Sequence, residues 1–263
     1  MELTSRDNPL VKEIGKLLSD AKYRRKSGRF AIEGARLCED AARSNVTIVA
    51  ALATPLAAEK YAASWQAVTA VAASVYTVSE TIARHLSDTD APQGIFCLCE
   101  AGERTFEVCE DGVYLALEDM QDPGNLGTVI RTAEAFGVDG LLLSKGCCDR
   151  YNPKVLRASM GGVFRMPMKV CEDLTAELRA LNERLPVLAC VVDADAEPIM
   201  AAPKNGAVAV IGNEGNGLTA AAVAACGRRV TIPMAGRAES LNASMAAGVV
   251  LWELCRERGR ATV

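Results

Sequence analysis

The stretch Gln121–Gly137, QDPGNLGTVIRTAEAFG, joins an apolar strand to a helix through a polar, glycine-containing turn. The strand predicted before it covers 113–117, VYLAL, and the helix after it is expected to begin near Leu126, where apolar residues start to recur at helical spacing. Residues 123–125, Pro-Gly-Asn, are typical of turns and helix caps. A turn of this kind after a buried strand is a place where ligands bind.

Arg131 stands out within this stretch. Helical side chains lean toward the N-terminus, so its guanidinium is expected to point at the turn around Asn125. A cation near a helix N-terminus opposes the helix dipole and costs up to about 1 kcal/mol unless an anion or a ligand lies nearby. The local sequence leaves two interpretations open, a solvated surface arginine or a functional group.

The rest of the chain predicts two α/β domains. From residue 112 onward, continuous apolar runs separated by helical patterns predict a parallel sheet, with strands at 113–117, 140–143, 163–168, 187–192, 207–211 and 229–232. Residues 1–100 begin with a basic helix over 8–25 and continue with short alternating strands and helices, which favour a small α/β sandwich. The charged segment 101–111 is the predicted linker, and 112–263 is the second domain.

Composition narrows the functional classes. No run of 18 apolar residues occurs and the first twenty residues carry charges throughout, so neither a membrane span nor a secretory signal is predicted, and we expect a cytoplasmic protein. The ten cysteines include no CxxC pair, which is typical of reduced, buried thiols. Because His85 is the single histidine, no metal site is predicted.

Positive charge is concentrated in two segments, although the net charge is −4. Residues 12–29 and 145–169 are both rich in lysine and arginine, with few carboxylates between them. One basic segment is usually only a solvated face, whereas two favour a localised footprint for a polyanion such as RNA or DNA.

Two further strand ends carry unusual sequences. The first, 212–218, reads GNEGNGL, and its glycines let the backbone approach a flat ligand closely, although a helix-capping turn before Thr219 is an alternative. It is neither a Rossmann GxGxxG nor a phosphate loop. The second, 232–242, reads IPMAGRAESLN, and either Ser240 or Asn242 can cap the helix that follows. That helix carries an apolar stripe that predicts a core or a subunit interface.

Together, these three segments resemble the motifs of the SpoU (TrmH-like) branch of the SPOUT RNA methyltransferases. The segment 152–161, NPKVLRASMG, looks like that family's sequence between the first two motifs, and 22–34 is similar to the L30e-like substrate-binding domain that many members carry. The resemblance implies transfer of a methyl group from S-adenosyl-L-methionine to a ribose 2'-hydroxyl in RNA. It also implies a deep trefoil knot in the second domain and a homodimer formed through that domain.

The resemblance favours ribosomal RNA over transfer RNA, because an L30e-like domain commonly accompanies ribosomal targets. A transfer RNA 2'-O-methyltransferase and a catalytically silent RNA-binding or assembly protein of the same fold are the alternatives. An unrelated nucleotide-binding enzyme such as a dehydrogenase is a third possibility, against which the missing GxGxxG motif counts.

Residue roles follow from the matching positions. The cofactor-binding positions implied are Gly212, Asn213, Gly217, Ile232, Met234 and Leu241. The positions implied for catalysis are Asn125, Arg131, Glu214, Ser240 and Asn242. The candidate RNA-binding residues are Lys22, Arg24, Arg25, Lys26, Arg29, Arg157 and Ser159. Because a guanidinium donates hydrogen bonds and has no lone pair for a proton, we expect Arg131 to stabilise the developing alkoxide or to hold a phosphate rather than to accept a proton.

Overall fold

The structure is a computed structural model that describes residues 2–87, 92–102, 105–203 and 206–258. Residue contacts group the chain into two units, Met1–Gly102 with Asp149–Phe164, and Glu103–Cys148 with Arg165–Val263. The domain limits expected from the sequence, 1–100, 101–111 and 112–263, stay a prediction. Residues 1 and 88–91 of the predicted first domain, 103–104 of the linker, and 204–205 and 259–263 of the second domain lie outside the described residues.

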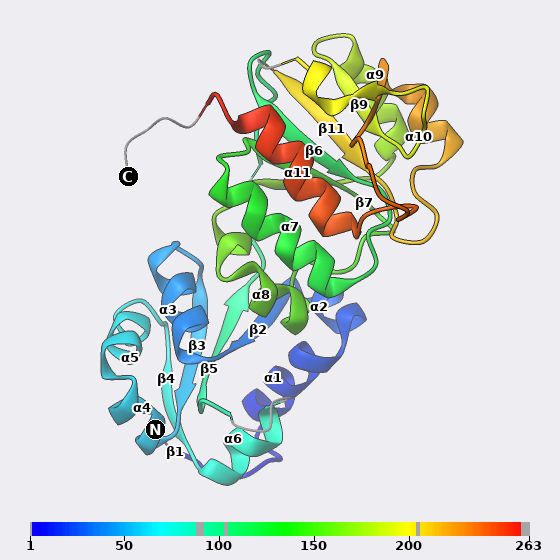
Figure 1. Cartoon of the computed structure of the whole chain (residues 1–263). Coiled ribbons are helices and arrows are strands. Elements are labelled where there is room, and N and C mark those ends of the chain that lie inside the picture. The colour runs from blue at the N-terminus through cyan, green and yellow to red at the C-terminus, as the bar shows by residue number, and fades with distance from the viewer. Residues whose placement is uncertain (1, 88–91, 103–104, 204–205, 259–263) are drawn as a thin grey trace. The chain divides into compact units, whose positions relative to one another are not determined.

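The first unit is a five-stranded sheet with helices on both faces (Figure 1). Its strand order is β1-β4-β3-β5-β2, in which β5 is antiparallel to both of its neighbours. The strands are β1 (Glu2–Leu3), β2 (Arg29–Glu33), β3 (Ile48–Ala53), β4 (Val75–Val78) and β5 (Ile95–Glu100). The helices are α1 (Pro9–Ser19), α2 (Ala21–Ser27), α3 (Ala35–Arg43), α4 (Pro55–Lys60), α5 (Ala62–Thr69), α6 (Glu80–Leu86) and α8 (Pro153–Ser159), followed by the 3-10 helix η1 (Gly162–Phe164).

Apolar residues of α1 and α6 form one half of this unit's core. Ile14, Leu17 and Ile82 pack against Leu52 and Phe96 of the sheet, all of them fully buried. Helix α3 packs with α5 on the other face of the sheet (Figure 1). The predicted small α/β sandwich is therefore observed.

The basic helix predicted over 8–25 is two helices. The chain breaks at Asp20, whose backbone is extended and whose carboxylate accepts hydrogen bonds from the N–H groups of Lys22 and Tyr23, at 2.8 and 3.0 Å. Asp20 is thus an N-cap, and the cap ends one helix and begins the next because it satisfies the first free N–H groups of α2.

The second unit is built on a seven-stranded, all-parallel sheet (Figure 1). Its strand order is β10-β12-β9-β11-β6-β7-β8. The strands are β6 (Val113–Leu117), β7 (Gly140–Ser144), β8 (Met168–Cys171), β9 (Val187–Cys190), β10 (Glu197–Pro198), β11 (Ala207–Ile211) and β12 (Arg228–Thr231). The helices are α7 (Pro123–Ala135), α9 (Leu174–Asn182), α10 (Ala220–Ala225) and α11 (Ala243–Cys255), with the 3-10 helix η2 (Ile199–Ala201).

Helices cover both faces of this sheet, which is why its central strands are apolar throughout. Tyr114 and Val208 belong to the cluster that α9 and α10 complete, so their alternate neighbours Leu115 and Ala209 point to the opposite face. Helix α11 packs on β11 and on α7 (Figure 1). The sequence prediction of a parallel sheet is confirmed, and the trefoil knot stays a prediction.

One predicted strand, 163–168, is wrong. Its first residues form η1, and β8 begins only at Met168. Met160 and Gly161 before it have left-handed backbones, with φ of +49° and +80°, which turn the chain away from an extended course. A short apolar run such as this one shows that its residues are buried, without distinguishing a strand from a compact turn.

Candidate active site

The turn after β6 is fixed by the cap of α7. Asp122 accepts a hydrogen bond from the Asn125 N–H at 2.7 Å, and Pro123 occupies the first helical position. The helix therefore begins three residues earlier than Leu126, the predicted start. Arg131 is consequently the ninth residue of α7. The argument that it opposes the helix dipole is wrong, because that effect is confined to the first turn.

The carboxylate of Glu214 is held at the beginning of α7. It accepts hydrogen bonds from the N–H groups of Gln121 and Asp122, at 3.2 and 3.1 Å, and from the Asn125 side-chain amide at 3.1 Å. Burial raises the pKa of Glu214, but the hydrogen bonds from Asn125 and from the backbone outweigh it and hold the pKa below its ordinary value. Glu214 is therefore a fixed anion and a weak base.

Asn125 connects Glu214 to the third motif. Its side-chain oxygen accepts a hydrogen bond from the Asn242 amide at 3.1 Å. The Asn242 oxygen in turn caps α11, accepting from the N–H groups of Ser244 and Met245, at 2.9 and 3.3 Å. The chain Glu214–Asn125–Asn242 thus joins segments that are far apart in sequence. Asn242 is the helix cap, which leaves the exposed Ser240 without that role.

The loop 212–218 is compact because its glycines permit close backbone contacts. A Cβ at Gly212 would lie 2.1 Å from the carbonyl carbon of Gly217, so no larger residue fits. Gly217 itself has a left-handed backbone, with φ +66°. Asn213 accepts hydrogen bonds from the N–H groups of Gly215 and Asn216, at 2.9 and 3.1 Å, which stabilises the same turn.

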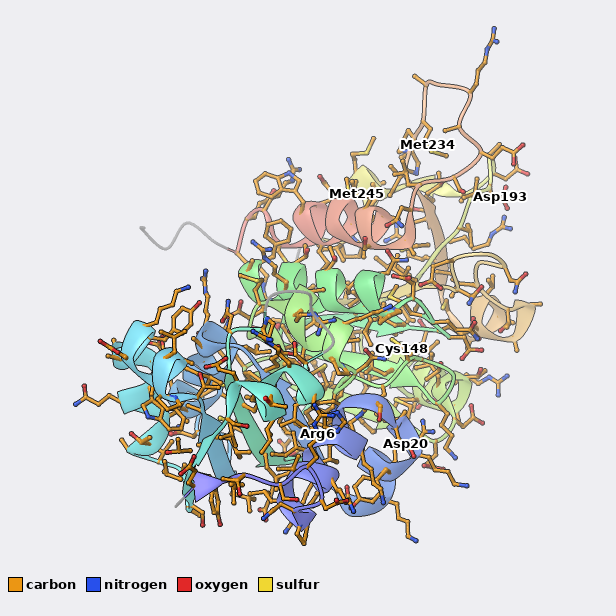
Figure 2. The ribbon with its side chains drawn as sticks, turned by 90° about the horizontal axis from the view of Figure 1, so that it is seen from below. Arg6, Asp20, Cys148, Asp193, Met234 and Met245 are labelled. Carbon is orange, nitrogen blue, oxygen red and sulfur yellow. The ribbon has the colours of Figure 1, made fainter. Side chains whose placement is uncertain are left out.

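A cavity of about 440 Å³ lies between this loop and the segment that leads into α11. All six predicted cofactor-binding residues line it, namely Gly212, Asn213, Gly217, Ile232, Met234 and Leu241. Glu214 and Ser240 also line it, and other walls are apolar, including Ile211, Leu218 and Val250. Met234 and Met245 are labelled in Figure 2, Met234 on the segment before α11 and Met245 on α11 itself.

This cavity suits an adenosyl group. Apolar walls can cover a flat ring, while the close-packed glycine backbone leaves room for the ring edge to approach peptide groups. Its volume lies within the range of small-molecule sites. When bound, S-adenosylmethionine would supply an electrophilic methyl group, and the residues that would hold it are those of the glycine loop and of the segment around Ile232 and Leu241.

The sequence reasoning missed Glu118, a carboxylate only 9% exposed, which follows β6. It accepts hydrogen bonds from the Thr219 N–H and hydroxyl, at 2.8 and 2.7 Å, and so anchors the far end of the glycine loop. The backbone carbonyl of the next residue, Asp119, accepts from the Asn213 side chain at 2.8 Å. The sequence signal was the acidic pair Glu118-Asp119 directly after a buried strand. Thr219, the hydrogen-bond partner of Glu118, lies 101 residues further along the chain.

Arg131 is exposed on α7 and forms no hydrogen bond or ion pair with any residue that the structure describes. Its guanidinium N–H groups therefore have no acceptor among the described residues and are available to a ligand. Asn125, Glu214 and Asn242 are joined directly, Ser240 lines the adjoining cavity, and Arg131 is the predicted catalytic residue that makes no direct contact with them.

The predicted RNA-binding residues separate into two groups. Lys22, Arg25, Lys26 and Arg157 are exposed, and Arg29 is half-buried in an ion pair with Glu13 at 3.1 Å. Arg24 is a correction, because it is only 4% exposed and donates at 2.6 Å both to Asp149 and to the carbonyl of Leu17. Ser159 is also a correction, since it is buried and its hydroxyl donates to the Leu156 carbonyl. Neither side chain can reach a phosphate in this arrangement.

Comparisons with known proteins agree with the fold. Residues 112–252 match the SpoU rRNA Methylase family, and residues 8–97 match the MRM3-like substrate binding domain. The chain is 31% identical over 256 residues to the 23S rRNA (guanosine(2553)-2'-O)-methyltransferase RlmP of Bacillus subtilis, covering 96% of this chain and 98% of that protein.

Solved structures agree across nearly the whole length. The AdoMet-bound rRNA methyltransferase from Sinorhizobium meliloti matches with a TM-score of 0.84 and 32% identity, covering 98% of both chains. An RNA 2'-O ribose methyltransferase matches with a TM-score of 0.80 and 34% identity, covering 98% of this chain and 99% of that one.

The chain therefore belongs to the SpoU rRNA methylase family. It is an RNA methyltransferase that uses S-adenosylmethionine, and the predicted fold class is confirmed by the solved relatives. Among the described residues, no helix is long and apolar enough to cross a membrane, and no group of three or more histidine, cysteine or acidic side chains is placed to hold a metal ion.

Proposed function

We propose that this protein methylates a ribose 2'-hydroxyl in ribosomal RNA. The observation that carries the proposal is the cavity lined by all six predicted cofactor residues, which adjoins the hydrogen-bonded chain Glu214–Asn125–Asn242. The relatives add support, because RlmP is named as a 23S rRNA 2'-O-methyltransferase and a solved relative as an RNA 2'-O ribose methyltransferase.

Each residue of the site has a separate role in the proposed reaction. Asn125 and Glu214 hold the start of α7 against the glycine loop, and Ser240 offers a hydroxyl at the cavity wall. Arg131 supplies a fixed positive charge for the oxygen of the attacking ribose, or for the phosphate beside it. Since Glu214 has a lowered pKa and a guanidinium has no lone pair with which to accept a proton, neither Glu214 nor Arg131 is assigned the role of general base.

A homodimer formed through α11 is part of the proposal. Met245, Val249 and Trp252 follow one another at spacings of four and three residues and are 62%, 38% and 58% exposed. Such spacing makes one apolar helix face, and Phe136, the residue that follows α7, extends it with a ring 5.7 Å from that of Trp252. A second copy of the chain would cover this face. A cytoplasmic location stays a prediction.

Comparing ribose methylation in cells with and without this protein tests the proposed substrate. Mapping 2'-O-methyl groups on ribosomal and transfer RNA is expected to reveal a ribosomal position that loses its methyl group when the protein is removed. A lost position in transfer RNA would instead support the alternative substrate. An unchanged map, with cofactor binding intact, would favour a silent RNA-binding protein.

A further inference from the structure

A second cavity, of about 310 Å³, lies within the first unit, between α3 and the end of α8. Arg36, Leu37 and Asp40 line it from α3, and Arg157 and Met160 line it from α8 and the residue that follows. None of the motifs assigned to methyl transfer reaches it, and Arg157 is its one residue already proposed to contact RNA. We call it the α3 cavity.

Three charged side chains of the α3 cavity have no partner among the described residues. Arg36, Asp40 and Arg157 form no hydrogen bond or ion pair with any of them. Elsewhere on the same helix, Arg43 and Glu39 do form an ion pair, at 2.5 Å. Glu33, the other carboxylate of the cavity, accepts from the Ser87 hydroxyl at 2.5 Å. Asp40 therefore remains as an acceptor of hydrogen bonds, and the two arginines remain as donors.

The rest of the lining comprises Gly34, the amide of Gln93, which accepts a hydrogen bond from the Ala35 N–H, and two apolar side chains, Leu37 and Met160. Leu37 is half-buried, and Met160 is 39% exposed with a left-handed backbone, φ +49°. A long side chain in that conformation is uncommon, and such conformations are concentrated at ligand sites. The flexible thioether of methionine packs well against aromatic rings.

We propose that the α3 cavity binds a single unstacked guanine of the RNA, an inference that rests on the proposed RNA substrate. A flat base would lie against Leu37 and Met160, with its edge toward Asp40. Guanine presents two adjacent donors, N1–H and the 2-amino group, which match the two oxygens of one carboxylate. Arg36 and Arg157 are suited to the phosphates on either side of that nucleotide.

Equilibrium binding of RNA hairpins to the full-length protein tests the proposal. The hairpins share one stem and differ in a single unpaired loop nucleotide, which is guanosine, inosine or adenosine. Inosine lacks the 2-amino group, so the unaltered protein should bind the guanosine hairpin about tenfold more tightly than the inosine hairpin. Asp40→Asn should bind the guanosine and inosine hairpins equally. Glu59→Gln, which removes an exposed carboxylate from α4, should keep the preference for the guanosine hairpin.

Two results would overturn the inference, namely equal affinity of the unaltered protein for the three hairpins, or a guanosine preference that survives in Asp40→Asn. Guanosine monophosphate competing as strongly as the hairpin would also contradict a site built for RNA. Thermal unfolding of Asp40→Asn checks that the variant is folded. Methyl transfer measured on the same preparations separates the two proposals. If methyl transfer fails while the guanosine preference is intact, only the proposed function is contradicted. If methyl transfer occurs while the guanosine preference is absent, only the proposal for the α3 cavity is contradicted.

Discussion

At the scale of single residues, the site depends on a few side chains that hydrogen-bond within the chain. Glu214 and Asn242 are held by backbone N–H groups and by Asn125, so these internal contacts set their orientation. Arg131 differs, because it has no partner among the described residues. This contrast supports the proposal that the first group positions the site and that Arg131 contacts the substrate.

Replacing Arg131 by Ala should therefore abolish turnover while leaving cofactor binding unchanged. Loss of one preorganised group that stabilises a developing negative charge typically lowers kcat by about 10²–10³-fold. Single-turnover methyl transfer measures the first quantity and calorimetric titration with S-adenosylmethionine the second. Thr128→Ala, an exposed position one turn earlier on α7, serves as the control. Weakened cofactor binding in Arg131→Ala would refute this division of roles.

The lowered pKa of Glu214 makes a prediction about pH. Because the folded-state pKa lies below the ordinary value of 4.5, the ionised carboxylate stabilises the fold above that pH. Its contribution should be lost as the pH falls through the lower, folded-state pKa. Denaturant unfolding of the unaltered protein and of Glu214→Gln should show a constant stability difference near neutral pH that shrinks on acidification. A difference that grows on acidification would contradict the assigned direction.

At the scale of elements, the basic helix α2 combines structural and exposed cations. Arg24 is buried in its ion pair with Asp149, whereas Arg25 and Lys26 are exposed on the same helix. Arg24→Gln should lower the free energy of unfolding by about 3–5 kcal/mol, because it leaves Asp149 unpaired. Lys26→Gln should leave stability unchanged and reduce the salt dependence of RNA binding by about one unit of slope.

These two effects are separated by measuring denaturant unfolding and RNA affinity against salt concentration for both variants. Exposed Lys60 on α4 offers a matched control, Lys60→Gln, outside the predicted footprint. If Lys26→Gln leaves the salt dependence of RNA affinity unchanged, α2 is not part of the RNA-binding surface.

The exposed face of α11 makes a separate prediction about assembly. Trp252→Glu would place a charge in the middle of the proposed dimer contact and should convert dimers into monomers. Light scattering after gel filtration measures the mass directly. Ala221→Glu, on the exposed side of α10, is the control and should remain dimeric. Monomers in the unaltered protein would contradict the proposed interface.

Local sequence was sufficient for most elements and insufficient for their long-range contacts. Strands β6 and β11 match their expected limits, 113–117 and 207–211, because apolar runs and flanking turn residues define them. The break at Asp20 was missed because a cap and a solvated helical aspartate look alike in sequence. The contact of Asn125 with Glu214 spans 89 residues, and no periodicity predicts it. The resemblance to the family, and not local physics, put these residues in one site.

At the scale of the whole molecule, the central claim is that this chain transfers a methyl group to a ribose hydroxyl of RNA. Purified protein is incubated with ribosomal RNA from cells that lack it and with methyl-labelled S-adenosylmethionine, and the RNA is then hydrolysed in alkali. A 2'-O-methyl group blocks cleavage at its own nucleotide. The label is therefore predicted in an alkali-resistant dinucleotide. Label released entirely as mononucleotides would place the methyl group on a base and would contradict the account.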